Sequence, residues 1–186
     1  MRSRHLLLCG LLVCTPCLAS NERLQEAEFT ERVSLENSNQ VLLLRNSYLL
    51  EYLFVDVYSA ALYAPADAAL GQLLNGDAAL RLELYYYRAI DREDVIKAAW
   101  VALERQYDKT TLAALKPSID QLHASLGNIR KGDRYSLTRT SEGNLVLRHN
   151  ESTTFESSDR QLADAYLGIW LRPNGLSDKL RTALLN

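Results

Sequence analysis

Apolar residues follow strand spacing and helix spacing in four successive blocks, and this order limits the folds open to the chain. Strands are expected first, at 41–45, 52–63 and 80–87, and again around 135–137, 145–147 and 153–155. Helices are expected to begin at Asp91, at Ser118, at Ser158 or Asp159, and at Ser177. Because the blocks do not alternate as regular strand–helix–strand units, an α+β fold is favoured over a doubly wound parallel sheet.

The segment 80–87 is the clearest strand. Its leucines and Tyr86 fall on one face, and Arg81, Glu83, Tyr85 and Tyr87 fall on the other. The polar face either lines a cleft or covers the sheet with amphipathic side chains, and the pattern leaves both readings open. Beyond the strand, we expect Arg88 to form an ion pair with Asp91, whose side chain should cap the following helix.

The two earlier strands are expected to turn near Asn46 and Ser47. Simple alternation along 54–63 places Tyr58 on one face with Asp56 and Ala60, and Val57 on the other. Further on, Ser118 with Gln121 resembles a capping box and predicts a helix start there.

The N-terminus has the three parts of a secretory signal. Arg2, Arg4 and His5 precede an apolar run at 6–13, and small residues follow at 17–20. We therefore expect a signal peptide at 1–19, a single domain at 20–186 with a loose lead-in at 20–28, and a periplasmic or secreted protein. The alternative is a lipoprotein acylated at Cys17. No other stretch resembles a membrane span.

Composition narrows the chemistry. All three cysteines lie in the expected signal, so the mature chain has no thiol for a disulfide, for catalysis or for a metal. Loss of Arg2 and Arg4 makes the formal net charge of −2 more negative, which argues against a nucleic-acid partner. Phosphate-loop and GxSxG motifs are missing, and His123 and His149 lie in different segments without a second ligand. No cofactor and no metal are expected.

Five short patterns in order resemble the chalcone isomerase-like family, in particular its bacterial exported branch. They are FVDVYSAALY at 54–63, LYYYRAI at 84–90, KGDRYSL at 131–137, YLGIWL at 166–171 and LSDKLR at 176–181. The resemblance implies an open-faced β-sandwich, in which a large antiparallel sheet carries a layer of helices on one face with a cleft between them. It also implies one of two activities: plant members cyclise a chalcone, and other members bind fatty acids without known chemistry.

The site residues of the isomerases carry over poorly. Tyr58 falls at a threonine, Asn46 at an arginine with Arg45 beside it, and Lys97 at a lysine, while Asp94 and Val101 replace a tyrosine and an asparagine. Only Lys97 fits, so chalcone cyclisation is not expected. The fatty-acid-binding branch has a tyrosine in place of the threonine, and Tyr58 matches it.

We therefore expect an exported, non-catalytic module that binds a small apolar or amphipathic ligand, such as a fatty acid, through Tyr58, Arg45 and Lys97. Two alternatives stay open: an isomerase or intramolecular lyase on another substrate, and a structural or partner-binding domain whose cleft is filled by its own side chains. Each residue also has an ordinary interpretation, since Tyr58 suits a core, Arg45 a strand end and Lys97 the solvent face of a helix.

Overall fold

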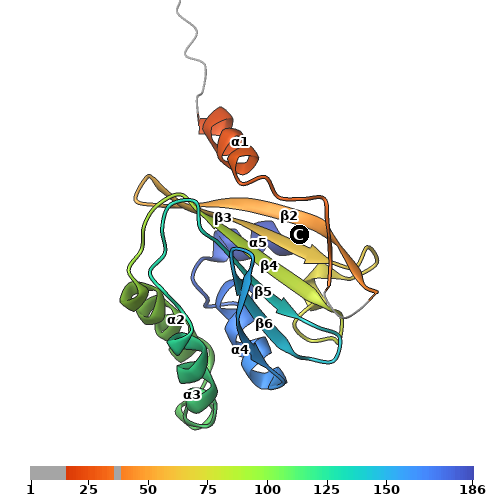
Figure 1. The fold of residues 1–186 in the computed structure, drawn as a ribbon, viewed down its shortest axis with the longest axis vertical. Coiled ribbons are helices and arrows are strands. Elements are labelled where there is room, and N and C mark those ends of the chain that lie inside the picture. The colour runs from red at the N-terminus through yellow and green to blue at the C-terminus, as the bar shows by residue number, and fades with distance from the viewer. Residues whose placement is uncertain (1–15, 36–38) are drawn as a thin grey trace, which may run out of the picture.

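One antiparallel sheet forms the frame of the molecule. The computed structural model describes residues 16–35 and 39–186, and in them seven strands pair in chain order, each with the next (Figure 1). The strands are β1 (Arg32–Ser34), β2 (Val41–Tyr52), β3 (Val55–Ala64), β4 (Leu80–Tyr86), β5 (Arg134–Arg139), β6 (Leu145–His149) and β7 (Ser152–Ser157). Most of the expected signal peptide lies outside the described residues.

Helices cover one face of this sheet. They are α2 (Arg92–Gln106), α3 (Lys109–Ala124), α4 (Arg160–Leu171) and α5 (Asp178–Leu185). Helix α4 packs on β5, β6 and β7 and also contacts the other three, and α5 packs on β2. The predicted fold class, a large antiparallel sheet with a layer of helices on one face, is confirmed. A short 3₁₀ turn, η1 (Leu70–Gln72), links β3 to β4.

The remaining helix, α1 (Pro16–Glu26), lies on the opposite face. The Tyr87 hydroxyl donates to the carbonyl oxygen of Arg23, and Arg23 Nε lies 2.7 Å from Asp56 Oδ2. The prediction of a loose lead-in at 20–28 is therefore wrong for its first part. Contacts with residues far along the chain, which local sequence does not show, hold this helix on the sheet.

The two faces of β4 divide as the alternation predicts. Leu80, Leu82, Leu84 and Tyr86 belong to the main core under the helices. On the other face Glu83 pairs with Arg81 at 3.0 Å and with Arg134 at 2.5 Å. The polar face thus covers the sheet beneath α1, and the reading in which it lines a cleft is wrong.

The hairpin of β2 and β3 turns seven residues later than expected. Strand β2 continues through Asn46 and Ser47 to Tyr52, and the turn is formed by Leu53 and Phe54. Their φ angles are +49° and +64°, the combination that a type I′ turn requires and that Asn-Gly normally supplies. Left-handed backbone costs a bulky residue about 1–2 kcal/mol, so this turn is intrinsically unfavourable.

Helix starts were predicted with mixed success. Asp159 and Ser177 cap α4 and α5 through their side chains, as expected. The capping box at Ser118 is wrong, because α3 begins at Lys109 under the Asp108 cap and runs through Pro117. In the described part of the chain, no helix is long and apolar enough to cross a membrane.

Candidate functional site: a cleft between sheet and helices

A cleft of about 790 Å³ opens between the ends of β2, β3 and β4 and the helices α2 and α4. Its walls are mainly apolar and come from both layers; the sheet and the β4–α2 loop supply Leu50, Val57, Tyr58, Tyr86 and Ile90, and the helices supply Val95, Ala99, Tyr166, Ile169 and Trp170. A volume of this size is typical of small-molecule sites, which bury most of the ligand against hydrophobic side chains.

Two β-bulges set which side chains reach the cleft. The pairing of β2 with β3 shifts between Leu44 and Asn46, and again between Leu50 and Glu51. The first shift leaves Arg45 without a partner in the pairing, so Leu44 packs in the small cluster on the α1 face while Tyr48 and Leu50 pack on the helix side. A single inserted residue reverses the face of everything that follows it.

The second bulge places an extra residue, Val57, in β3. Val57 and Tyr58 consequently both line the cleft, whereas Asp56 pairs with Arg23 and Ser59 with Tyr87 on the α1 face. The alternation that put Asp56 on the face of Tyr58 and Val57 on the other is therefore wrong at these two residues. The bulge widens the apolar wall by one side chain.

Tyr58 lies buried on the floor of the cleft against α4. Its hydroxyl oxygen accepts a hydrogen bond from Trp170 Nε1 at 3.1 Å, and its ring lies 5.3 Å from that of Tyr86. Burial raises the pKa of Tyr58 far above its ordinary value of 10, and the Trp170 N–H opposes this only in part. The phenol therefore stays neutral, and its own O–H proton has no acceptor among the described residues. It is a hydrogen-bond donor available to a ligand.

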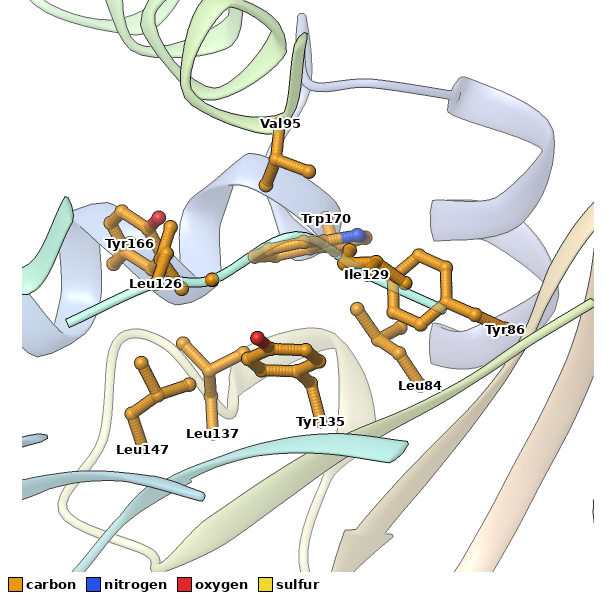
Figure 2. Close-up of a pocket in the computed structure, with 11 residues that line it drawn as sticks. Leu84, Tyr86, Val95, Leu126, Ile129, Tyr135, Leu137, Leu147, Tyr166 and Trp170 are labelled. Carbon is orange, nitrogen blue, oxygen red and sulfur yellow. The ribbon is translucent and has the colours of Figure 1, made fainter. Parts of the chain in front are cut away.

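Behind this floor the space narrows to a small apolar cavity. Figure 2 shows Val95 and Trp170 on the helix side of it, with Tyr135 and Leu137 facing them from the sheet. The cavity measures about 30 Å³, which is room for one or two water molecules and not for an organic ligand. It shares Val95 and Trp170 with the cleft, so the larger outer space is the part that can receive a ligand.

Charged groups stand only at the mouth. Arg88, Asp91 and Asp94 are exposed and line the cleft. The expected ion pair between Arg88 and Asp91 does not form: no ion pair or hydrogen bond involves the Arg88 side chain in the described residues. Asp91 is the N-cap residue of α2, but its side chain accepts no hydrogen bond from the first turn of the helix. Asn128 Oδ1 accepts the hydrogen bond of the Arg92 amide instead.

The other cations expected at the site lie elsewhere. Arg45 Nη1 donates to the carbonyl oxygen of Pro65 at 2.5 Å, and Lys97 is exposed on α2. Neither lines the cleft. Asn46, at the position that the family resemblance assigns to an arginine, donates to the carbonyl oxygens of Leu184 and Asn186 at the end of α5. The prediction that Arg45 and Lys97 contact a ligand stays untested, and their positions favour Arg88 as the cation of the site.

Two members of the site were not anticipated. Trp170 lies 112 positions from Tyr58, so no local signal in the sequence links the two. Arg88 was assigned to an ion pair, although its place between a strand end and a helix start is where binding residues often lie. Among the described residues no group of His, Cys, Asp and Glu converges as a metal site would need.

Comparison with known proteins supports this architecture. The family model for chalcone isomerase-like proteins matches residues 21–186. A crystal structure of a fatty-acid binding protein from Arabidopsis thaliana superposes with a TM-score of 0.60, at 14% identity, over 83% of this chain and 96% of that one. At that identity the likeness shows the fold alone. A search of curated proteins by sequence finds no match.

Proposed function

Because the chain belongs to the chalcone isomerase-like family, we propose that it binds a small amphipathic ligand of the fatty-acid class in the cleft and holds it without chemistry. The observation that carries the proposal is the Tyr58 phenol. Trp170 occupies its acceptor side at 3.1 Å, which leaves one directed donor on the floor of an otherwise apolar space. A few placed polar groups in an apolar pocket are the usual way in which small-molecule sites orient a ligand.

The ligand class follows from the walls of the cleft and from its polar groups. The walls suit a hydrocarbon chain, and the Tyr58 hydroxyl suits a carbonyl or carboxylate oxygen. Arg88 also lines the cleft and is a cation without an ion pair in the described structure, so its long side chain can turn toward a carboxylate held by Tyr58 at no cost in broken contacts. At the mouth, Asp91 and Asp94 disfavour a second acidic group. A monocarboxylic amphiphile therefore fits better than a dicarboxylic one. The plant fold neighbour, which is a fatty-acid binding protein, supports the same class.

Binding of a long-chain fatty acid, followed by calorimetry, tests the proposal. Tyr58→Phe should weaken binding severalfold, or tenfold and more if the hydroxyl meets a carboxylate. Arg88→Gln should weaken the fatty acid but not the fatty alcohol of equal length, because only the acid carries a charge. Absence of binding by the wild-type protein, or equal affinity of all variants, contradicts the proposal.

Arg45→Gln and Lys97→Gln serve as matched controls, since both remove a cation outside the cleft lining. We expect both variants to bind the fatty acid with wild-type affinity. A loss of affinity equal to that of Arg88→Gln would show that Arg45 or Lys97 contacts the headgroup. Ring closure of a chalcone above background, abolished by Lys97→Ala, would instead favour the isomerase alternative.

Export remains part of the proposal. The signal-like N-terminus supports a periplasmic or secreted location. N-terminal sequencing of protein from its own host should find a start near Ser20. Retained Met1, or a lipid on Cys17, would contradict cleavage at that point.

A further inference from the structure

The tip of the β2–β3 hairpin carries the largest exposed apolar side chains in the described part of the chain. Phe54 is 100% exposed and Leu53 is 73% exposed, while the flanking Tyr52 and Val55 are 69% and 43% exposed. Figure 1 shows the turn between the two strands projecting from one end of the sheet, away from the layer of helices. Four consecutive apolar residues held in water mark an interaction surface rather than a scatter of single exposed side chains.

The backbone of the turn supports the same conclusion. Leu53 and Phe54 both have positive φ angles, where asparagine and glycine are strongly preferred. Leu53 and Phe54 therefore destabilise the turn that they occupy, and they also expose apolar surface to water. Residues held in unfavourable backbone conformations cluster at functional positions. The strained turn therefore points to a function for its exposed side chains.

The tip is continuous with the mouth of the cleft. Tyr52 belongs to both, since it flanks the turn and lines the cleft together with Leu50. Leu176, which is 36% exposed, lines the same opening from the segment before α5. Whatever contacts the tip is thus brought against the opening through which a ligand enters.

We propose that the hairpin tip, residues 52–55, inserts into the interfacial region of a lipid bilayer and holds the mouth of the cleft against it. The four side chains expose roughly 600 Å² at most, less than the ~800 Å² that each partner contributes to a standard protein interface. A bilayer needs no matching surface, and a narrow convex tip enters it more easily than it fills a protein groove. Tyr52, apolar with a polar end, suits the boundary between lipid and water.

Charged residues of both signs surround the tip, which predicts how the docking depends on lipid. Glu51, Asp91 and Asp94 are exposed acids, and Arg88, Arg130 and Lys131 are exposed cations; the 130–131 segment lies at this end because the amide of Gly132 donates to the carbonyl oxygen of Tyr86. Asp56, next to the tip, pairs with Arg23, which also pairs with the exposed Glu26. Cations are therefore not in excess among the described residues at this end, so apolar insertion should dominate and neutral lipid should suffice.

The docking surface itself does not depend on the ligand; only its use, the exchange of an amphiphile between membrane and cleft, rests on the proposed function. The two claims therefore fail separately. Tyr58→Phe should weaken fatty-acid binding and leave vesicle binding unchanged. A change at the tip should weaken vesicle binding and leave fatty-acid binding in detergent-free solution unchanged.

Flotation of the full chain with phosphatidylcholine vesicles, with and without phosphatidylglycerol, tests the proposal. The wild-type protein should float with both, and the double variant Leu53→Asn/Phe54→Gly should lose at least about tenfold in partition coefficient. That variant introduces the preferred turn residues, so it should unfold at the same or a higher temperature. The matched control Val101→Asn, which removes an exposed apolar residue on α2, should bind vesicles as the wild type does.

A direct reading of depth comes from Phe54→Trp. Brominated phosphatidylcholine should quench the added fluorescence relative to the wild-type background. Failure of the wild type to float, equal flotation of the double variant, or no quenching would each overturn the proposal. Concentration-dependent dimerisation that the double variant abolishes, without vesicle binding, would assign the tip to a second copy of the chain and overturn it as well.

Discussion

Replacing Tyr58 by phenylalanine removes one oxygen atom from the floor of the cleft, and the surroundings of that atom give the expected cost. The oxygen accepts from Trp170 Nε1 at 3.1 Å, and the two residues are 5% and 8% exposed. In Tyr58→Phe the indole N–H stays buried without an acceptor. Leaving a buried donor unsatisfied costs about 1–3 kcal/mol, which for a chain of this length lowers the melting temperature by a few degrees.

A double-mutant cycle separates this bond from the packing around it. Trp170→Phe removes the donor and also creates a void, so its own cost is not diagnostic. When both changes are made, the unsatisfied N–H no longer exists, and the two costs should fall short of additivity by about 1 kcal/mol. Urea denaturation, followed by circular dichroism, measures the free energy of unfolding of the wild type, the two single variants and the double variant.

Tyr86→Phe is the matched control, because Tyr86 lines the same cleft with its ring 5.3 Å from Tyr58 and its hydroxyl has no hydrogen-bond partner among the described residues. We expect little loss of stability from it. Additive costs for Tyr58→Phe and Trp170→Phe, within about 0.3 kcal/mol, would refute the claim that the indole holds the phenol.

Two further predictions concern stability. Burial lowers the pKa of His123 from 6.5 to about 4, so the unfolded chain takes up the proton first, and the free energy of unfolding should fall as the pH drops from 6.5 to 4. His123→Phe should reduce that slope in urea titrations, and an unchanged slope would contradict the assignment. A Cβ on Gly175 would lie 2.4 Å from the carbonyl oxygen of Ile169, so Gly175→Ala should cost about 2 kcal/mol. Gly168→Ala meets only the flexible side chain of Arg172, and its melting temperature should stay within a few degrees of the wild type.

Features governed by short-range physics could be read from the sequence. The alternation in β4 predicted which side chains face the helices, because successive residues of a strand point to opposite faces. Asp159 and Ser177 were found as caps because a capping side chain bonds within its own turn. Helix α3 shows the limit: its Asp108 cap was overlooked and Ser118, well inside the helix, was taken for a start, since the same residue types occur at both places.

The cleft was predictable in outline and not in detail. Tyr58, expected from the family resemblance to bind the ligand, lines the cleft between sheet and helices, and its contact with a ligand stays a prediction. The bulges at Arg45 and Val57 were not predicted, since an inserted residue is visible only against the partner strand. The same holds for the ion pair assigned to Arg88: proximity in sequence to Asp91 says nothing of the direction in which the two side chains point.

Several departures from local rules lie at one end of the sheet. The positive φ angles at Leu53 and Phe54, the extra residue Val57 and Arg88, which forms no ion pair among the described residues, all lie where β2, β3 and β4 meet the cleft. At the other end the Arg45 bulge interrupts β2, but β3 and β4 pair without a register shift and bury leucines completely. Natural sequences tend to break such rules at functional sites and to offset the loss elsewhere. The regular β3–β4 pair and its buried leucines therefore supply stability with which the chain keeps an open, apolar and exposed end.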